Sequence, residues 1–286
     1  MNSSTSYSRL PAATQDALSL IRKTVVGFDR ITLWVNHPKP KIPRSIRNRL
    51  GRKVTIKTRS VSYHAYWQTE IRIHQPYVDG LRALPRVLCG KYATKIAYAE
   101  IAIDWIAASQ DDAAQLQQYI LQHFYLKHSR YPVKFEKSTA YYGPRASETH
   151  GKFNRNFVIY ADKFSKLARG KKLPCCHLEY RFGSPKLNCI GLFTIGDCAA
   201  FDFHGFWPRH LNLVRFSSKK NLGRILDPEN QDVSSASFRQ RADVFLKVHA
   251  YQGGFILQDC ILQRREIMPI LEPIDNRHFL TKPAVR

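Results

Sequence analysis

The chain has 286 residues, of which 44% are hydrophobic and 12% aromatic. This is enough to form one large core or two small ones, and the composition excludes a disordered protein. Lys and Arg number 45 against 22 Asp and Glu, which gives a formal net charge of +23. So large a net charge causes repulsion within the folded domain. The usual reason for such an excess of positive charge is a polyanionic partner. We therefore expect nucleic acid as the partner, with an anionic membrane as the alternative.

The sequence shows neither the pattern of a membrane-spanning helix nor that of an export signal. No apolar run approaches the roughly 20 residues that a spanning helix needs, and no stretch is both basic and strongly amphipathic. The first residues lack the basic-then-apolar order of a signal peptide. The chain has six cysteines, and several of them lie with histidines at residues 175–204. No two of the cysteines form a C-x-x-C pair. We therefore predict a cytoplasmic protein with no membrane partner, and reduced thiols in preference to structural zinc.

In chain order, the hydrophobic periodicity predicts an α+β domain. Strands are expected at residues 30–36, 53–59, 68–74, 96–106, 139–142, 156–160 and 177–182. Helices are expected at residues 12–23, 77–88 and 109–127, with Ser109 as the N-cap of the last, and a short one at 45–50. This order predicts a largely antiparallel central sheet with helices packed on one face. We divide the chain into an N-terminal arm (1–24), a main domain (25–215) and a C-terminal extension (216–286) with a helix candidate at 236–249.

Two segments concentrate positive charge. The first segment, residues 39–59, follows the first expected strand, and the second is a turn at residues 163–172. A solvated loop and a phosphate-contacting arm both explain such one-signed charge, and we expect contact with DNA. The aromatic residues Tyr63, Tyr66 and Trp67 are available to stack on unpaired bases. The expected DNA-binding residues are Lys39, Lys41, Arg44, Arg47, Arg49, Arg52, Lys53, Arg155, Arg169, Lys171 and Lys172.

Acidic residues occur inside two otherwise apolar strands. Residues two apart in a strand share a face, so Glu100 lies with Asp104, and Glu179 lies with His177 and Arg181. Buried acids are costly without a partner, and oxygen ligands suit Mg²⁺ or Mn²⁺. Glu100 and Asp104 are separated by roughly 13 Å along an ideal strand, so one ion cannot reach both without a bend. Glu100 with Glu179 is the first candidate pair, with Asp104 acting through water or a basic partner. Salt bridges with Arg181 or other cations are the alternative explanation.

Tyr160 ends the 156–160 strand and is followed by Asp162 and Lys163. Tyrosine is common on half-buried strands, so core packing alone explains its presence. As a nucleophile it must lose a phenolic proton whose ordinary pKa is near 10. A metal ion, Lys163 or Arg155 would have to stabilise the phenolate.

Four segments occur in an order that resembles the Rep_trans family of rolling-circle replication initiators from plasmids and phages. They are IAYAEIAIDW, TAYYGPRASE, NFVIYADKF and CHLEYRFG. The resemblance covers roughly residues 28–215 and implies a replication-initiator nuclease-like fold. In that family a tyrosine nicks one DNA strand and becomes linked to its 5′ phosphate, with a divalent metal held by acids. It implies that Tyr160 is the nucleophile, with Lys163 and Arg145 as catalytic partners. Gly143 and Ser147 match the same turn as Arg145, and Glu100, Asp104 and Glu179 match the metal-holding acids.

The sequence departs from the family in three places. Glu100 stands where Asp is usual, Arg181 stands where a second Glu is common, and the loop at 147–155 is longer than expected. Arg181 weakens a three-acid metal site. The His-hydrophobe-His motif of other rolling-circle nucleases is absent, since no two histidines are two residues apart.

The leading hypothesis is therefore a metal-dependent nicking and joining enzyme that initiates rolling-circle replication in the main domain. Its expected partners are origin DNA, both double-stranded and extruded single-stranded, and a host helicase and DNA polymerase, with a homodimer as a possible assembly. The alternative is a non-catalytic DNA-binding regulator of a phage or plasmid. A metal nuclease that uses water as the nucleophile is the third hypothesis.

Overall fold

The computed structural model describes residues 12–58, 66–124, 126, 133–143, 155–170, 172–184, 186–216 and 271–280. Several expected features lie outside these ranges. They are Tyr63, Arg145, Ser147, Lys171, and the helix expected at 236–249.

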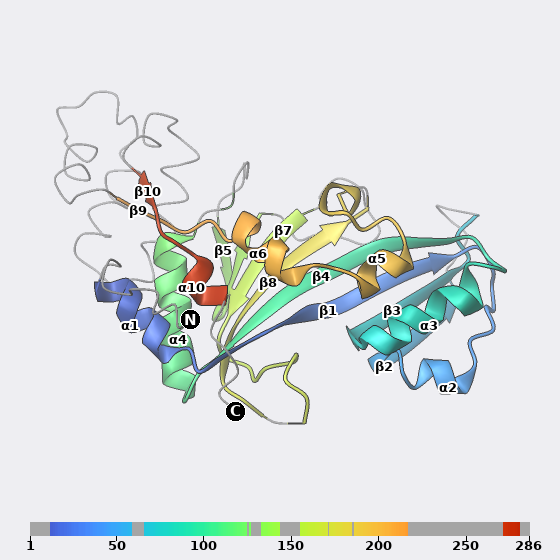
Figure 1. Cartoon of the computed structure of the whole chain (residues 1–286), viewed down its shortest axis with the longest axis horizontal. Coiled ribbons are helices and arrows are strands. Elements are labelled where there is room, and N and C mark those ends of the chain that lie inside the picture. The colour runs from blue at the N-terminus through green and yellow to red at the C-terminus, as the bar shows by residue number, and fades with distance from the viewer. Residues whose placement is uncertain are drawn as a thin grey trace, which may run out of the picture.

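The described chain is organised around one eight-stranded sheet with the order β2-β3-β1-β4-β8-β7-β6-β5, in which every pair is antiparallel (Figure 1). The sheet strands are β1 (Lys23–Val35), β2 (Gly51–Thr58), β3 (Thr69–Pro76), β4 (Thr94–Ile106), β5 (Val133–Glu136), β6 (Thr139–Tyr142), β7 (Arg155–Tyr160) and β8 (Cys175–Gly183). A two-stranded sheet joins β9 (Val214–Phe216) to β10 (Leu271–Pro273). The helices are α1 (Ala12–Leu20), α2 (Arg44–Arg47), α3 (Val78–Leu88), α4 (Gln110–His123), η2 (Asn188–Ile190), α5 (Ile195–Ala199), α6 (Phe203–His210) and α10 (Arg277–Leu280).

The strands β1 and β4 form the long centre of the sheet, with 13 residues each. Their register shifts by one residue between Phe28 and Arg30, because Phe28 pairs with Ile101 and Arg30 pairs with Glu100. Asp29 is thus an extra residue in β1, a β-bulge of the kind that redirects a side chain. β3 pairs with β1 only from Arg30 to Val35, so the first half of β1 has β4 as its only partner strand among the described residues.

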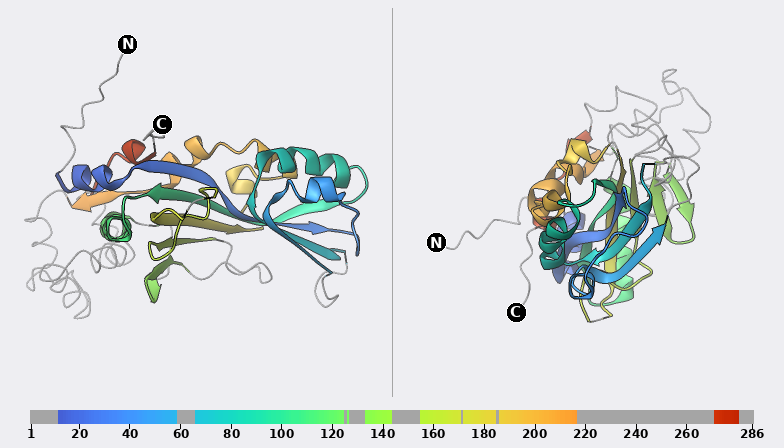
Figure 2. Two further views of the ribbon diagram at one scale, coloured as in Figure 1. Left: turned by 90° about the horizontal axis from the view of Figure 1, so that it is seen from below. Right: turned by 90° about the vertical axis from the view of Figure 1, so that its right-hand side faces the viewer.

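One face of the sheet is apolar and carries the helices. The ring of Phe157 of β7 stacks at 4.2 Å from that of Phe124, the residue just after α4, and the ring of Tyr180 lies 6.0 Å from Trp207 of α6. Trp105 contacts Phe279 of α10 at 5.2 Å, so residues from near the C-terminus complete this core. Figure 2 shows α3, α5, α6 and α10 along this side of the sheet. The expected α+β architecture, with helices packed on one face, is confirmed.

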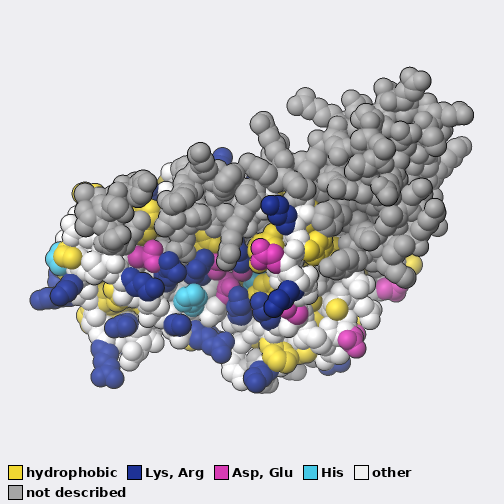
Figure 3. Space-filling model, turned by 180° about the vertical axis from the view of Figure 1, so that it is seen from behind, with side chains coloured by type: hydrophobic (Ala, Val, Ile, Leu, Met, Phe, Trp, Pro, Cys, Tyr) yellow, Lys and Arg dark blue, Asp and Glu magenta, His cyan; other side chains and the backbone are white. Residues whose placement is uncertain are grey.

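The opposite face receives the alternate residues of the same strands, and these are charged or polar. The register places Asp104 beside His177 and Glu100 beside Arg181. In the space-filling view from this side, Lys and Arg side chains spread over the surface with acidic groups between them (Figure 3). Strand alternation therefore separates a helix-covered core from a charged face.

Short elements account for most differences from the sequence-based expectation. The four-residue β5 and the helices α5 and α6 were not predicted, and α4 ends at His123 instead of near residue 127. Ser109 caps α4 as expected, with its Oγ accepting a hydrogen bond of 3.1 Å from the Asp112 amide. None of the described helices has both the length and the apolar character needed to cross a lipid bilayer.

Candidate catalytic centre on the charged face of the sheet

Four neighbouring strands and one loop bring their polar side chains together. β8 lies between β4 and β7, so His177 is opposite Asp104 on one side and Tyr160 on the other. The bulge residue Asp29 adds a carboxylate from β1. The segment of residues 161–170 contacts this group, since Ser165 and Leu167 donate hydrogen bonds to Asp104 and Lys166 pairs with Asp29.

His177 is at the centre and is held through both ring nitrogens. Its Nδ1 pairs with Asp104, and its Nε2 lies 3.1 Å from an oxygen of Glu179. All three side chains are buried. Burial alone lowers the pKa of an imidazole, but Asp104 outweighs this effect and raises the pKa of His177 to about 10. His177 is therefore a cation at neutral pH in the metal-free protein.

Arg181 links the other two strand acids. Its Nε donates to Glu179 and lies 3.7 Å from Glu100. Glu100 also accepts hydrogen bonds from Arg30 at 2.7 Å and from the Tyr98 hydroxyl at 2.9 Å. Burial raises the pKa of Glu100, and the neighbouring carboxylate of Glu179 adds to the rise. Burial acts the same way on Glu179, but Arg181 and His177 outweigh it and lower its pKa.

Asp29 was not predicted as a site residue, because the bulge breaks the alternation by which strand residues are recognised in a sequence. Its carboxylate lies 2.7 Å from the Nζ of Lys166 and accepts a hydrogen bond from the Gln75 amide. The expected strand began at Arg30, so Asp29 lay just outside it. The available signal in the sequence was an acid immediately before a β-rich run.

Asp104 fastens the loop as well as the imidazole. It accepts hydrogen bonds from the Ser165 hydroxyl and, at 3.1 Å, from the Leu167 amide. These bonds and the one to His177 outweigh the effect of burial and lower the pKa of Asp104. With its acceptor positions occupied in this way, Asp104 orients His177 and the loop. The structure therefore does not place it with Glu179 as a ligand of one ion.

Tyr160 packs its ring against His177, with centroids 4.5 Å apart. The amino groups of Lys163 and Lys166 lie 5.1 and 5.4 Å from the ring centroid. The side chain is buried, and its hydroxyl has no hydrogen-bond partner among the described residues. Burial, followed by the charge of Glu179, Asp29 and Asp104, raises the pKa of Tyr160 above its ordinary value. The hydroxyl is therefore a neutral phenol in the metal-free protein.

The best group for a divalent cation among the described residues is Asp29, His177 and Glu179, whose ligand atoms all lie within 4.8 Å of one another. Two carboxylates with an imidazole suit Mn²⁺ well, and carboxylate oxygen suits Mg²⁺. Asp104 on Nδ1 leaves Nε2 to face the ion, as is usual for a ligating histidine. The residues therefore fit a cation, although the set differs from Glu100, Asp104 and Glu179. Only Glu179 belongs to both sets.

The remaining expected residues lie at different distances from this cluster. Arg155 begins β7, five positions before Tyr160, and the alternation directs it to the helix-covered face, where its charge acts on His210. It is therefore not placed to stabilise a Tyr160 phenolate. Tyr66 is 57% exposed and contacts Trp67 at the far end of β1. The other described members of the expected DNA-binding set are exposed: Lys39, Lys41, Arg44, Arg47, Arg49, Arg52, Lys53, Arg169 and Lys172.

Comparison with known proteins gave a structural likeness but no match in sequence. No family model and no curated protein matches the sequence. A solved structure of a rolling circle replication initiator protein from Geobacillus stearothermophilus is similar to this chain, with a TM-score of 0.39 and 8% sequence identity. The match covers 70% of this chain and 90% of the other.

Proposed function

We propose that this protein nicks and rejoins one strand of DNA through a covalent link between Tyr160 and a 5′ phosphate, and so initiates rolling-circle replication. The observation that carries the proposal is the position of Tyr160. Its ring packs on the imidazole of a buried Asp–His–Glu array, and two lysines lie beside it. A nucleophile next to groups that suit a hard cation, on a cationic protein, fits chemistry on a phosphodiester.

In this reaction the Tyr160 oxygen forms a bond to phosphorus and loses its proton. The bond from phosphorus to the 3′ oxygen breaks, and that oxygen leaves as a 3′-hydroxyl, which is available to prime synthesis. Rejoining is the reverse transfer, so the phosphotyrosine conserves the bond energy. Lys163 and Lys166 lie where positive charge favours a phenolate and a phosphate.

Mg²⁺ or Mn²⁺ would be held by Asp29, His177 and Glu179, and would supply Lewis-acid polarisation of the phosphate oxygens. Two of the carboxylates that raise the pKa of Tyr160, Glu179 and Asp29, are ones that a cation would neutralise. Binding also requires that His177 lose its Nε2 proton, which is opposed by the charge of Asp104 because that charge raises the pKa of the imidazole. A chelator is therefore expected to abolish nicking.

The decisive experiment uses supercoiled DNA that carries the cognate origin, with Mg²⁺ or Mn²⁺, followed by denaturing electrophoresis. Wild type should give a slower protein band that carries DNA, and Tyr160→Phe should give none. The matched control is Tyr142→Phe. Tyr142 is also buried, and its hydroxyl has no hydrogen-bond partner in the part of the chain that the structure describes, but it lies on the helix-covered face against Phe124. It should retain full activity.

The Tyr160→Phe protein is expected to fold. It loses a buried hydroxyl that has no partner among the described residues. Its free energy of unfolding should therefore stay level or rise by no more than about 1 kcal/mol, and its melting temperature should not fall. Nicking that persists in Tyr160→Phe would point to the water-using nuclease or to another tyrosine.

A second candidate is a DNA-binding module without catalysis. It is favoured by the ion pairing of the cluster, in which Lys166, Arg181 and His177 already match Asp29, Glu179 and Asp104. Tight binding of a verified origin with no nicking by wild type would select this function.

A further inference from the structure

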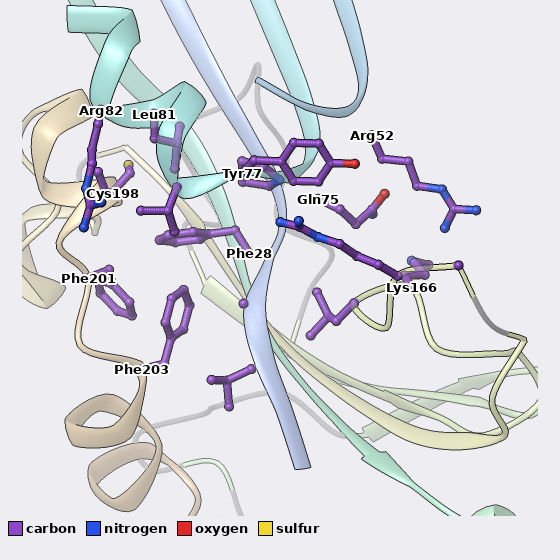
Figure 4. A pocket seen from close by; sticks show the side chains of 18 residues that line it. Phe28, Arg52, Gln75, Tyr77, Leu81, Arg82, Lys166, Cys198, Phe201 and Phe203 are labelled. Carbon is purple, nitrogen blue, oxygen red and sulfur yellow. The ribbon is translucent and has the colours of Figure 1, made fainter. Parts of the chain in front are cut away.

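A cavity of about 630 Å³ opens where β3 separates from β1. Val26, Gly27 and Phe28 line it, from the half of β1 that lies beyond the β3 pairing. The other walls come from the start of α3, the loop near Lys166, and residues 198–203. In the close-up, β1 crosses the middle of the view, with Phe28, Phe201 and Phe203 on one side of the strand and Lys166 and Gln75 on the other (Figure 4).

Aromatic rings form one wall of the cavity. Phe28, Phe201 and Phe203 contact one another with centroids 5.0 to 5.3 Å apart. Tyr77 stands at the entry of α3, and the guanidinium of Arg169 lies 4.1 Å above its ring. Flat, apolar and cation-stacked surfaces of this kind accept a nucleobase.

The charged lining has a single sign. Among the described residues that line the cavity, none is Asp or Glu and four are basic: Arg52, Arg82, Lys166 and Arg169. Lys166 is paired with Asp29, and Arg82 lies 3.9 Å from the exposed Asp79. Arg52 and Arg169 form no ion pair among the described residues, so their charge faces the cavity uncompensated. They come from the two separate basic segments that the sequence marks for DNA contact.

The cavity adjoins the catalytic cluster. Gln75 and Lys166 both line it, and both contact the carboxylate of Asp29. Its volume lies within the range of roughly 300–1,000 Å³ that suits small ligands. An acidic peptide would match the arginines but not the aromatic wall, and an apolar molecule would leave the arginines unpaired.

We propose that this cavity holds one unstacked nucleotide of the bound DNA strand beside the phosphate that is cut. The base lies against the aromatic wall, and the nucleotide's phosphate lies between Arg52 and Arg169. The inference rests on the proposed function for its substrate. It assigns the region where β3 leaves the sheet as the site that grips single-stranded DNA.

The first test is photocross-linking to a short single-stranded oligonucleotide that contains 5-iodouracil, in the presence of a chelator so that no nicking is required. Mass spectrometry should place the cross-link on Tyr77, Phe201 or Phe203. Cross-links confined to other regions, such as residues 39–49 or Tyr66 and Trp67, would overturn the proposal.

The second test compares affinities for single-stranded and duplex DNA, again with chelator. Tyr77→Leu and the double variant Arg52→Ser with Arg169→Ser should each weaken single-strand binding about tenfold, with a smaller effect on duplex binding. Two matched controls lie outside the cavity. Tyr92→Leu removes a half-buried tyrosine that packs on His37, and Arg86→Ser removes an exposed arginine on α3. Both controls should bind as wild type does, and equal losses in cavity and control variants would contradict the inference.

The two proposals fail separately. Wild type that forms the Tyr160 adduct while the cavity variants bind single strands normally would refute the cavity alone. Cross-linking at the cavity without any adduct or nicking would refute the proposed function and leave a single-strand-binding protein.

Discussion

At the residue scale, the central fact is the matching of buried acids with cations. Glu179 is fully buried and Glu100 nearly so, and Arg181 contacts both. Removing one partner of a buried ion pair leaves an uncompensated charge, which costs more than the pair itself contributes. Arg181 interrupts the expected three-acid metal site, yet it is also what allows two carboxylates to stand side by side in the absence of a metal.

We therefore expect Arg181→Met to lower the free energy of unfolding by about 3–5 kcal/mol, because the side-chain volume is kept while Glu179 loses its guanidinium partner and Glu100 keeps only Arg30. The control is Lys53→Met on the exposed surface of β2, for which a change of about 0.5 kcal/mol or less is expected. Urea unfolding monitored by circular dichroism measures both. A loss of less than about 1 kcal/mol in Arg181→Met would show that the acids share a proton instead of relying on Arg181.

At the element scale, one glycine allows α3 to lie close to the backbone that follows α2. A Cβ added at Gly80 would lie 2.1 Å from the carbonyl oxygen of Arg49, whereas a Cβ at Gly90 would have no atom within 4 Å. The backbone of Arg49 cannot rotate away as a flexible side chain does. Gly80 is therefore a close-packing position that holds α3, and with it Tyr77, against the sheet.

Gly80→Ala is expected to destabilise the protein by about 3 kcal/mol or more, because α3 must move outward. Gly90→Ala provides the control and should be neutral or slightly stabilising, since it only restricts the unfolded chain. Thermal unfolding of the two variants compares them directly. Equal melting temperatures would mean that α3 shifts without strain.

The sequence predicted the elements whose signals are long, and missed what depends on pairing between strands. Alternation correctly placed Glu100 with Asp104, and Glu179 with His177 and Arg181, on single faces. It could not show that Asp104 would meet His177, because that contact depends on the register of β4 against β8. Asp29 escaped notice because a bulge interrupts the period of two on which strand assignment depends.

At the scale of the whole molecule, the charge of +23 is the property that most constrains binding. Neutralising phosphates releases counterions, so affinity for DNA falls as salt rises. The exposed cations after β1 are separate in the chain from the catalytic cluster, and they offer a way to test electrostatic binding without touching it.

Replacing Lys39, Lys41 and Arg44 with serine should reduce the slope of log affinity against log salt by roughly 2–3 units, because each phosphate contact contributes about 0.9. Replacing the exposed Lys91, Lys95 and Lys134 removes the same charge from other parts of the surface and should change the slope less. Fluorescence anisotropy with labelled DNA over a salt series gives both slopes. A flat response in wild type would contradict the polyanion partner itself.

The bulge at Asp29 means that a residue of the candidate metal site can be removed from the gene without removing a residue that the strand needs. Without this residue, Gly27 and Arg30 on the charged face and Phe28 and Ile31 on the helix-covered face would follow a regular alternation along β4. Asp29 thus has the character of a one-codon insertion into a strand that is otherwise complete. Deleting that codon should leave a folded protein with unchanged far-ultraviolet circular dichroism, but with a deficit in Mn²⁺ binding measurable by calorimetry. Deletion of one codon would then remove metal binding and leave the fold in place.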